Sequence, residues 1–426
     1  PGSTFKILAA YSAALDAGGL TLASVQDDAP YTYAGANGKS VNNYDRRYRG
    51  FTTLREAITD SINIVTVKTL AQAGVSLGWQ YVQEYGFTTV DSRDMNEALA
   101  LGGITQGVSN LELTAAYAAI ANQGTYTQPV YYTQVKDKDG NVILDNTQPL
   151  THTVLKKSTS WLLTNALESV TAAGTAEAAA LSNQPTAGKT GTTEDYNDLW
   201  FVGYTPYYTC TTWTGYDNNT KLRKGEERSL AKKLWYDDNS KELSGYIDHR
   251  KMWRTIMQEI HDNLPTGSFE KPDDIVETEV CSQSGKLPVA SLCDQDPRGS
   301  QLVTEYFSKD NNPTDTCDVH IKVTICDDTG KIASANCPHK TTKIMIKKAA
   351  IVKNPSNEDE TTYTTWDQEY AITEEQLSKV CTAHGGSSSG STSPGNSSGT
   401  TQSTTAPSST KPTTSSHSNT SGTTRR

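Results

Sequence analysis

The hydrophobic pattern begins with a segment that is apolar on every side. Residues 3–17 are almost continuously apolar apart from Lys6, Ser12 and Asp16, and the pair Gly18-Gly19 ends the run. A surface helix carries one polar face, whereas a helix that is apolar all round packs inside a protein. Glycine directly after such a run is typical of a helix end. The pattern therefore predicts a buried helix at the start of the chain.

Further along, helical periodicity gives way to strand-like runs and then returns once. The predicted helices are 53–73 with an interruption at 61–63, a helix from the capping box at 109–112 to Gly124, a helix capped by Ser158, and 249–261. The last helix is expected to bury Met252, Trp253, Ile256, Met257 and Ile260. A hairpin is predicted around the Asp-Gly turn at 139–140, and three strand-like runs lie at 185–193, 199–205 and 207–216. We therefore predict an α+β fold, in which an antiparallel sheet is flanked by helices around the buried first helix.

Composition divides the chain into three parts. Lysine and arginine total 38 against 48 aspartate and glutamate, and the net charge of −10 is too acidic for a general nucleic-acid binder. No run of 18 apolar residues is present, so we expect no membrane span within the chain. Residues 385–426 are almost entirely Ser, Thr, Gly, Pro, Asn and Gln, a composition that predicts disorder. The predicted domains are therefore 1–265, a β-rich extension with cysteines at 266–384, and this tail.

Six of the seven cysteines lie between residues 281 and 381. Two intervals repeat, because Cys281–Cys293 begins C-S-Q-S-G-K-L and Cys326–Cys337 begins C-D-D-T-G-K-I, each with a glycine turn. We interpret them as two copies of a cysteine-bounded hairpin, and we predict a disulfide within each interval in an oxidising setting. Reduced, partly buried thiols are the alternative. A zinc site is disfavoured because no C-x₂₋₄-C pair is present, and neither a metal nor a cofactor is predicted.

Three short motifs bring together residue types that suit acyl transfer. Ser3 and Lys6 are three residues apart, so on a helix their side chains share a face, about 5–6 Å apart at Cβ. A lysine buried in an apolar helix has a lowered pKa and can act as a base toward the serine. Ser61 and Asn63 stand where the second helical region is interrupted, and Lys189-Thr190-Gly191 lies on a predicted strand. Taken singly the motifs say little, but the three in this order form a catalytic set.

With these motifs in place, the sequence resembles the transpeptidase domain of class A high-molecular-mass penicillin-binding proteins, over about residues 1–265. The resemblance implies the α+β fold of that family. It also implies a serine enzyme that cross-links peptidoglycan stem peptides as a D-Ala-D-Ala transpeptidase, and that binds penicillin covalently through an acyl-enzyme on Ser3.

The resemblance implies a role for each polar residue of the first two motifs and for Lys189 of the third. Ser3 would attack the carbonyl between the two terminal D-alanines, and Lys6 would accept its proton. Ser61 would relay that proton to the leaving amine, and Asn63 would bind the amide backbone of the donor peptide. Lys189 would support this network electrostatically.

The resemblance also assigns the strand motif and the surroundings. The hydroxyls of Thr190 and Thr192 would hold the terminal carboxylate, and Gly191 would leave room for the substrate backbone. The N–H groups of Ser3 and Thr192 would form the oxyanion hole. The partners would be stem peptides and β-lactams, with no nucleic acid. The location would be the extracytoplasmic face of a bacterial membrane or the cell wall.

Family members carry a membrane anchor and a glycosyltransferase domain upstream, and strands that precede the serine helix. This chain opens at Pro1. We therefore expect membrane association only through a segment missing here, and glycosyltransferase activity only in the full-length protein. We also expect the chain of 426 residues to react poorly with labelled penicillin.

Several other functions fit parts of the pattern. A DD-carboxypeptidase, with water in place of the acceptor amine, and a non-catalytic β-lactam sensor would use the same side chains. A class A β-lactamase is disfavoured because no E-x-x-L-N string occurs and Ile62 stands where those enzymes usually have Asp. The G-x-S-x-G pattern at 74–78 lacks the preceding strand that a nucleophile elbow needs. His249 and His261 are interpreted as partly exposed helix residues rather than members of a Ser-His triad.

Overall fold

The computed structural model describes most of the first 384 residues: 1–34, 39–193, 197–215, 248–351 and 364–384. Residues 1–384 form one compact unit, and residues 385–426 are a separate unit. The predicted boundary at 265 lies inside the first unit and stays a prediction. The predicted disorder of the tail lies outside the described residues. Among the described residues, no helix is both long enough and apolar enough to cross a membrane.

The first segment is helical and buried, as its apolar pattern predicts. It starts with a 3₁₀ turn at Gly2–Thr4, continues as a π-helix at Lys6–Tyr11, and ends as α1, Ser12–Asp16. Every side chain from Phe5 to Leu15 is buried, including that of Lys6. The π-helical stretch is a departure from a regular α-helix of the kind that is frequent at functional sites.

Helices surround this segment. They are α2 Leu54–Thr59, α3 Asn63–Ala73, α4 Val75–Glu84, α5 Asn110–Ala121 and α6 Lys157–Ala173. The interruption predicted at 61–63 lies at 60–62, because Asn63 is already the first residue of α3. The capping box of α5 is confirmed, with the Ser109 hydroxyl accepting from the Glu112 N–H. The predicted cap at Ser158 is wrong, because α6 starts one residue earlier and Ser158 lies inside it, buried.

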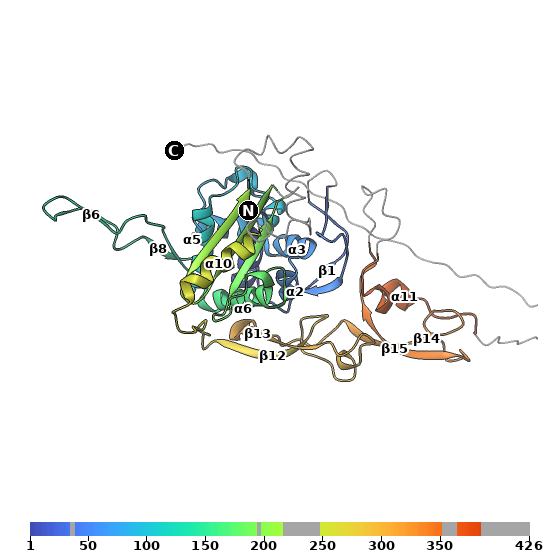
Figure 1. The fold of residues 1–426 in the computed structure, drawn as a ribbon. Helices are drawn as coiled ribbons and strands as arrows, with labels where there is room; N and C mark the ends of the chain where they lie inside the picture. Colours follow the sequence, from blue (N-terminus) through green and yellow to red (C-terminus); the bar gives the residue numbers. More distant parts are fainter. Residues whose placement is uncertain (35–38, 194–196, 216–247, 352–363, 385–426) are drawn as a thin grey trace, which may run out of the picture. The chain divides into compact units, whose positions relative to one another are not determined.

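Three antiparallel strands form the sheet that carries the strand motif. They are β9 Ala187–Thr192, β10 Asp198–Tyr204 and β11 Thr209–Gly215, in the order β11-β10-β9. The predicted meander is confirmed. Helix α6 packs along β9, and both α5 and α10, His249–His261, pack along β11. Figure 1 shows α10 alongside these strands. The predicted α+β fold, with helices around a buried first helix, is therefore confirmed.

The buried face of α10 is narrower than the sequence suggests. Trp253 and Met257 are buried as predicted, but Ile256 and Ile260 are 43% and 48% exposed. The residues of α10 that face the sheet are spaced four apart and run from His249 to His261. Both histidines, at the two ends of the helix, are therefore buried. The expectation that these histidines are partly exposed is therefore wrong.

Shorter strand pairs connect the helices. They are β1 Val25–Asp28 with β4 Gly50–Thr53, β2 Tyr31–Thr32 with β3 Ser40–Val41, β5 Thr125–Thr127 with β8 Thr151–Thr153, and β6 Gln134–Lys136 with β7 Val142–Asp145. The last pair is the hairpin predicted from the Asp-Gly turn.

The cysteine-rich part contains two strand hairpins and one short helix. Its elements are β12 Ile275–Cys281 with β13 Leu302–Ser308, β14 His320–Cys326 with β15 Lys340–Lys347, β16 Ala371–Ile372 parallel to β15, and α11 Glu374–Ser378. The first cysteine of each repeated interval ends a strand, and the second lies in the connection to the next strand. The interval between the cysteines therefore lies in the connection of a longer hairpin. It contains the predicted glycine turn, which in the second copy is closed by an antiparallel bridge between Ile325 and Ile332.

A bidentate ion pair fastens the first of these hairpins to the helices. Arg55 of α2 donates from Nε and Nη2 to the two carboxylate oxygens of Glu305 in β13, each at 2.6 Å. The Glu305 side chain is only 6% exposed. Beside the pair, Trp161 of α6 meets Tyr306 edge to face, with ring centroids 5.1 Å apart.

Candidate active site

The serine segment lies directly against strand β9. Gly2 has a positive φ of 55°, and a Cβ atom there would lie 2.6 Å from the carbonyl oxygen of Thr192. A Cβ on Gly191 would lie 2.3 Å from the carbonyl oxygen of Pro1. Both positions therefore need glycine, because only glycine lets the two backbones approach this closely. The contact places Ser3, the residue after Gly2, at the end of the strand motif.

Lys6 links the first motif to the second. Its side chain is fully buried, and its Nζ lies 2.6 Å from the Ser61 carbonyl oxygen and 3.1 Å from Ser61 Oγ. The same group donates to Asn63 Oδ1 at 2.6 Å. Ser3 sits on the preceding turn of the same helical segment, half-buried. Among the described residues, the Ser3 hydroxyl has no hydrogen-bond partner, so no other side chain there holds its oxygen.

Lys189 joins the third motif to the same hydroxyl. Its Nζ donates to Ser61 Oγ at 2.8 Å and lies 3.3 Å from the carbonyl oxygen of Thr190. The side chain is fully buried in β9. Two lysines that are far apart in the sequence thus both contact the same serine oxygen. The structure brings together Lys6, Ser61, Asn63 and Lys189, as the motifs predict.

Burial controls the charge of both lysines. It lowers the pKa of Lys6 well below its usual value, and the nearby charge of Lys189 lowers it further. Burial also lowers the pKa of Lys189, to about 7. A neutral amine at Lys6 can accept a proton, whereas a charged one cannot. The site therefore favours a neutral Lys6 next to a Lys189 that can still carry charge near neutral pH.

Ser61 is held in an unusual backbone conformation. Its φ is +56°, in the left-handed region that non-glycine residues rarely adopt. Such a residue costs on the order of 1–3 kcal/mol and persists where its surroundings fix it. Here Ser61 lies in the short connection between α2 and α3, and its hydroxyl contacts both lysines. The conformation is the means by which this hydroxyl points into the site.

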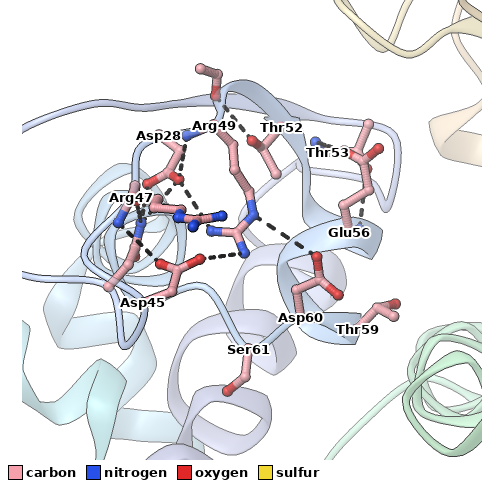
Figure 2. A network of polar contacts seen from close by, with 12 residues as sticks. Asp28, Asp45, Arg47, Arg49, Thr52, Thr53, Glu56, Thr59, Asp60 and Ser61 are labelled. Atoms are coloured by element: carbon pink, nitrogen blue, oxygen red, sulfur yellow. Dashed lines mark hydrogen bonds and ion pairs between the residues drawn. The ribbon is translucent and has the colours of Figure 1, made fainter. Parts of the chain in front are cut away.

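A network centred on Arg49 supports that connection (Figure 2). The guanidinium lies 3.9 Å from Asp60, the residue before Ser61, and 3.1 Å from Asp45. It also lies 3.8 Å from the buried Asp28, whose carboxylate accepts from the Arg49 N–H at 2.9 Å. The network ties the connection that bears Ser61 to strand β1.

Asn43 is a second supporting residue that the motifs do not reveal. Its Oδ1 accepts from the N–H groups of Asn63 and Ile64, at 3.1 and 3.2 Å, and so caps the start of α3. Its Nδ2 donates to both oxygens of Asp28. The Asn63 side chain is fixed in addition by a 2.7 Å hydrogen bond to the carbonyl oxygen of Asn42. No sequence spacing links residues 42–43 with 63, because the contact depends on the folded loop.

The two threonines of β9 differ in their surroundings. The Thr190 hydroxyl is 3.0 Å from that of Thr175 and is half-buried, whereas the Thr192 side chain is exposed. The role of both in binding a carboxylate stays a prediction.

The competing serine sites find no support in the described geometry. The residues before Gly74 form α3 and those after it α4, so no strand leads into the G-x-S-x-G pattern. His261 is held by the Met257 carbonyl oxygen at 2.6 Å and by the Thr205 hydroxyl at 2.8 Å, which gives it a structural role. His249 is buried at the other end of α10.

Two protein-family models match the chain. Residues 1–235 match the penicillin binding protein transpeptidase domain, and residues 271–322 match the C-terminal domain of penicillin-binding protein 1A. Penicillin-binding protein 1A of Clostridium botulinum (strain Langeland) is 35% identical over 348 residues, which are 79% of this chain and 39% of that protein. Penicillin-binding protein 1F of Bacillus subtilis is 40% identical over 223 residues, 51% of this chain and 30% of that one. The chain thus spans well under half the length of these relatives.

Solved structures share the fold. Penicillin-binding protein 1A from Haemophilus influenzae is similar with a TM-score of 0.58 and 24% identity, over 74% of this chain and 48% of that one. PonA1 from Mycobacterium tuberculosis, in complex with penicillin V, is similar with a TM-score of 0.51 and 21% identity, over 64% of this chain and 71% of that one.

Proposed function

Because the chain belongs to the penicillin-binding protein transpeptidase family, we propose that it is a serine D-Ala-D-Ala transpeptidase acting on peptidoglycan stem peptides. The observation that carries the proposal is the meeting of two buried lysines on one serine. Lys6, one helical turn after Ser3, and Lys189 both contact Ser61 Oγ. This arrangement supplies a nucleophile, a desolvated base and a proton relay in one place.

In the first step, Ser3 Oγ attacks the carbonyl carbon between the two D-alanines. Its proton passes to Lys6, whose lowered pKa makes the neutral amine available. The C–N bond then breaks, and the departing D-alanine amine takes the proton back from Lys6 through the Ser61 hydroxyl, which lies 3.1 Å from it. The product of the step is an ester on Ser3.

The developing oxyanion is held by backbone donors. We assign this role to the N–H groups of Ser3 and Thr192, since the backbone of the preceding Gly2 lies against Thr192. The charged form of Lys189 stabilises the negative charge near Ser61. Asn63, oriented by its contacts to Lys6 and to the Asn42 carbonyl oxygen, offers its amide to the donor peptide.

In the second step, the amine of a neighbouring stem peptide attacks the ester. The new C–N bond forms, the ester C–O bond breaks, and the Ser3 oxygen recovers a proton from the attacking amine through Lys6. In the first step, before the terminal D-alanine leaves, Thr190, Gly191 and Thr192 border its carboxylate, and the exposed Thr192 side chain is open to a ligand. A β-lactam would acylate Ser3 in the same way, with its opened ring still attached.

The proposed cellular setting follows from the substrate. Stem peptides are linked outside the cytoplasmic membrane, so we place this chain at the extracytoplasmic face or cell wall. We propose that the catalytic domain ends near residue 265 and the extension occupies 266–384. A membrane anchor and a glycosyltransferase activity belong to the proposal only for a longer protein that contains this chain, in keeping with the longer relatives.

The test combines covalent labelling with product analysis. Ser3→Ala is expected to reduce acylation by labelled penicillin and formation of cross-linked product by about 10³-fold or more, because the nucleophile is lost. The matched control is Ser92→Ala, which removes an exposed hydroxyl elsewhere in the chain and is expected to leave both unchanged. The adduct is located by mass spectrometry, and the labelled fraction measures how well this chain reacts.

The products separate the candidate activities. A cross-linked dimer from a stem-pentapeptide donor and an amine acceptor supports the transpeptidase. Release of D-alanine with only hydrolysed donor identifies a carboxypeptidase, and a stable adduct on Ser3 without turnover identifies a sensor. A penicillin adduct on a residue other than Ser3 contradicts the proposed nucleophile.

A further inference from the structure

Two clusters of cysteine and histidine lie in the part of the chain that the catalytic chemistry does not use. In each, three thiols and one imidazole converge so that all four ligand atoms lie within 4.8 Å of one another. The first consists of Cys281, Cys293, Cys317 and His320, and the second of Cys326, Cys337, Cys381 and His384. All are buried except His384, which is half-buried. We call them the first and second Cys₃His clusters.

The cysteines of the clusters are free thiols, so the predicted disulfides are contradicted. Cys281 and Cys293 do belong to the same cluster, as do Cys326 and Cys337, but a third sulfur joins each pair. The sulfurs of Cys281 and Cys317 are 3.7 Å apart, far beyond the bonded distance of about 2.05 Å. A pairing within each interval would leave that third thiol and the histidine without a role.

The spacing of the ligand atoms fits a tetrahedral zinc ion. Zinc–sulfur bonds of about 2.3 Å and zinc–nitrogen bonds of about 2.0–2.1 Å place two sulfurs about 3.8 Å apart, and sulfur and nitrogen about 3.6 Å apart. The Cys281–Cys317 separation of 3.7 Å matches the first value. His320 Nδ1 lies 3.4 and 3.5 Å from these sulfurs, which matches the second.

The second cluster repeats this geometry with different residues. His384 Nδ1 lies 3.4 Å from the sulfur of Cys326 and 3.3 Å from that of Cys381. In both clusters, therefore, Nδ1 of the histidine points at the sulfurs.

The other nitrogen of each histidine meets a carboxylate. Nε2 of His320 lies 2.8 Å from the buried Asp296, and Nε2 of His384 lies 3.3 Å from Asp328. A metal-binding histidine usually donates its second N–H to such a group, which fixes the ring and the tautomer. The carboxylates thus complete the surroundings expected of a metal ligand.

The backbone around the first cysteine of each cluster is built to the same plan. The N–H of Gly285 donates to the Cys281 carbonyl oxygen at 2.7 Å, and that of Gly330 to the Cys326 carbonyl oxygen at 2.8 Å. Both glycines have positive φ, 70° and 69°. The repeated C-x-x-x-G-K sequence therefore makes one turn twice. The missed sequence signal is a second repeat, C-x-x-H, at 317–320 and 381–384.

A metal would also supply stability that this part of the chain lacks. Its apolar clusters are small, and two of them are centred on the cysteines themselves. A third small cluster joins Ala23 with Val280 and Phe307, while Ile275 of β12 belongs to the main core. Small modules with little apolar core commonly depend on a structural metal.

From these observations, we propose that each Cys₃His cluster binds one Zn²⁺ ion through three thiolates and the histidine Nδ1. Binding releases the three thiol protons and leaves the imidazole neutral, with its proton on Nε2 facing the carboxylate. Four protein ligands close the coordination sphere, so these are structural sites with no position for a substrate.

Metal content of the whole chain is the first test. The protein of 426 residues, reconstituted with Zn²⁺ under reducing conditions and dialysed, is expected to hold two zinc ions per chain by elemental mass spectrometry. Co²⁺ in their place is expected to give the absorption of tetrahedral thiolate coordination. Less than half an equivalent of metal overturns the proposal, as does native protein whose cysteines pair as Cys281–Cys293 and Cys326–Cys337.

Single substitutions then assign the sites. Cys317→Ser and Cys381→Ser are each expected to lower the content from two ions to one, because each removes one ligand from one cluster. The matched control is Cys210→Ser, which alters the thiol outside both clusters and is expected to keep two. Two ions retained in both cluster variants would refute the assignment.

A milder substitution tests the carboxylate without removing a ligand. Asp296→Asn is expected to raise the Zn²⁺ dissociation constant of the first site by about 10–100-fold, measured by chelator competition. The control is Asp318→Asn, an exposed side chain beside Cys317 that does not contact the imidazole. Equal affinities for the two variants would count against Nδ1 coordination at His320.

Discussion

At the scale of single residues, the site depends on how two lysines share one hydroxyl. A serine oxygen can accept from both Lys6 and Lys189, but two charged ammonium groups beside it repel each other. The proton is lost more readily from Lys6, because burial and the charge of Lys189 both lower its pKa. The two lysines therefore differ in charge. Lys6 is neutral and acts as the base, whereas Lys189 is charged and supports the site electrostatically.

The lysine pKa values predict a bell-shaped pH profile for acylation. The rate is expected to rise with pH while Lys6 loses its proton, and to fall through about pH 7 as Lys189 loses its own. The measurement is the rate of labelling by penicillin as a function of pH.

The control for this profile is Lys189→Arg, which keeps a positive charge at all accessible pH values. The falling limb is expected to move to higher pH in this variant, even if the overall rate is lower. A wild-type rate that continues to climb well above pH 7 would show that the charge of Lys189 is not needed.

Most of the site residues can be predicted from the sequence, but the residues that hold them in place cannot. Ser3, Lys6, Ser61 and Lys189 are found because the three motifs that contain them occur together in the order of a known catalytic set. Asn43 is not found, because its contacts to α3 arise only when an irregular loop folds back. The site roles themselves remain predictions until they are measured.

At the scale of elements, the start of α3 is the part on which the second motif depends. Its own N-cap residue, Ile62, has no side chain that can accept a hydrogen bond. Asn43 supplies that acceptor from a different loop and is itself held by the buried Asp28. Helix α3 thus begins at a fixed place even though the local sequence provides no cap.

Asn43→Ala is expected to destabilise the protein by about 2–3 kcal/mol, because two N–H groups and a buried carboxylate lose their partner. It is also expected to slow acylation, since Asn63 and Ser61 lose their alignment. Urea unfolding and penicillin labelling measure the two effects. The control is Asn42→Ala, which keeps the carbonyl oxygen that Asn63 uses. Equal losses in both variants would mean that the cap contributes little.

Elements are predicted well where a local pattern decides them and poorly where packing does. The capping box at Ser109 and the meander from Ala187 to Gly215 follow from local sequence. Ser158 looks like a cap but is buried within α6, and Ile256 looks like a core residue but faces outward. In both cases, packing against the neighbouring elements determines which residues of the helix are buried.

At the scale of the whole unit, the cysteine-rich part is joined to the helices by a buried charge pair. Arg55→Met is expected to destabilise the β12–β13 hairpin by up to about 3 kcal/mol, because it leaves the Glu305 carboxylate buried without its partner. Hydrogen exchange in β12 and β13 is the measurement. The double variant with Glu305→Met is expected to recover part of the loss.

The control for this prediction is Arg93→Met, which breaks an exposed ion pair with Asp91 and is expected to change little. Unchanged exchange in the Arg55 variant would mean that apolar contacts such as Trp161 with Tyr306 hold the hairpin alone. This long-range pair has no signal in the sequence, since its members are 250 residues apart.

The second Cys₃His cluster also determines how the chain would respond to force. Cys381 and His384 lie directly before the tail, and they reach back to Cys326 at the end of β14. Strand β16 runs parallel to β15 just before them. Force applied to the chain after His384 would therefore pass through the bonds of this cluster to Cys326 as well as along the backbone to β16. With zinc in place, this cluster would hold the C-terminal end of the described chain to the end of β14.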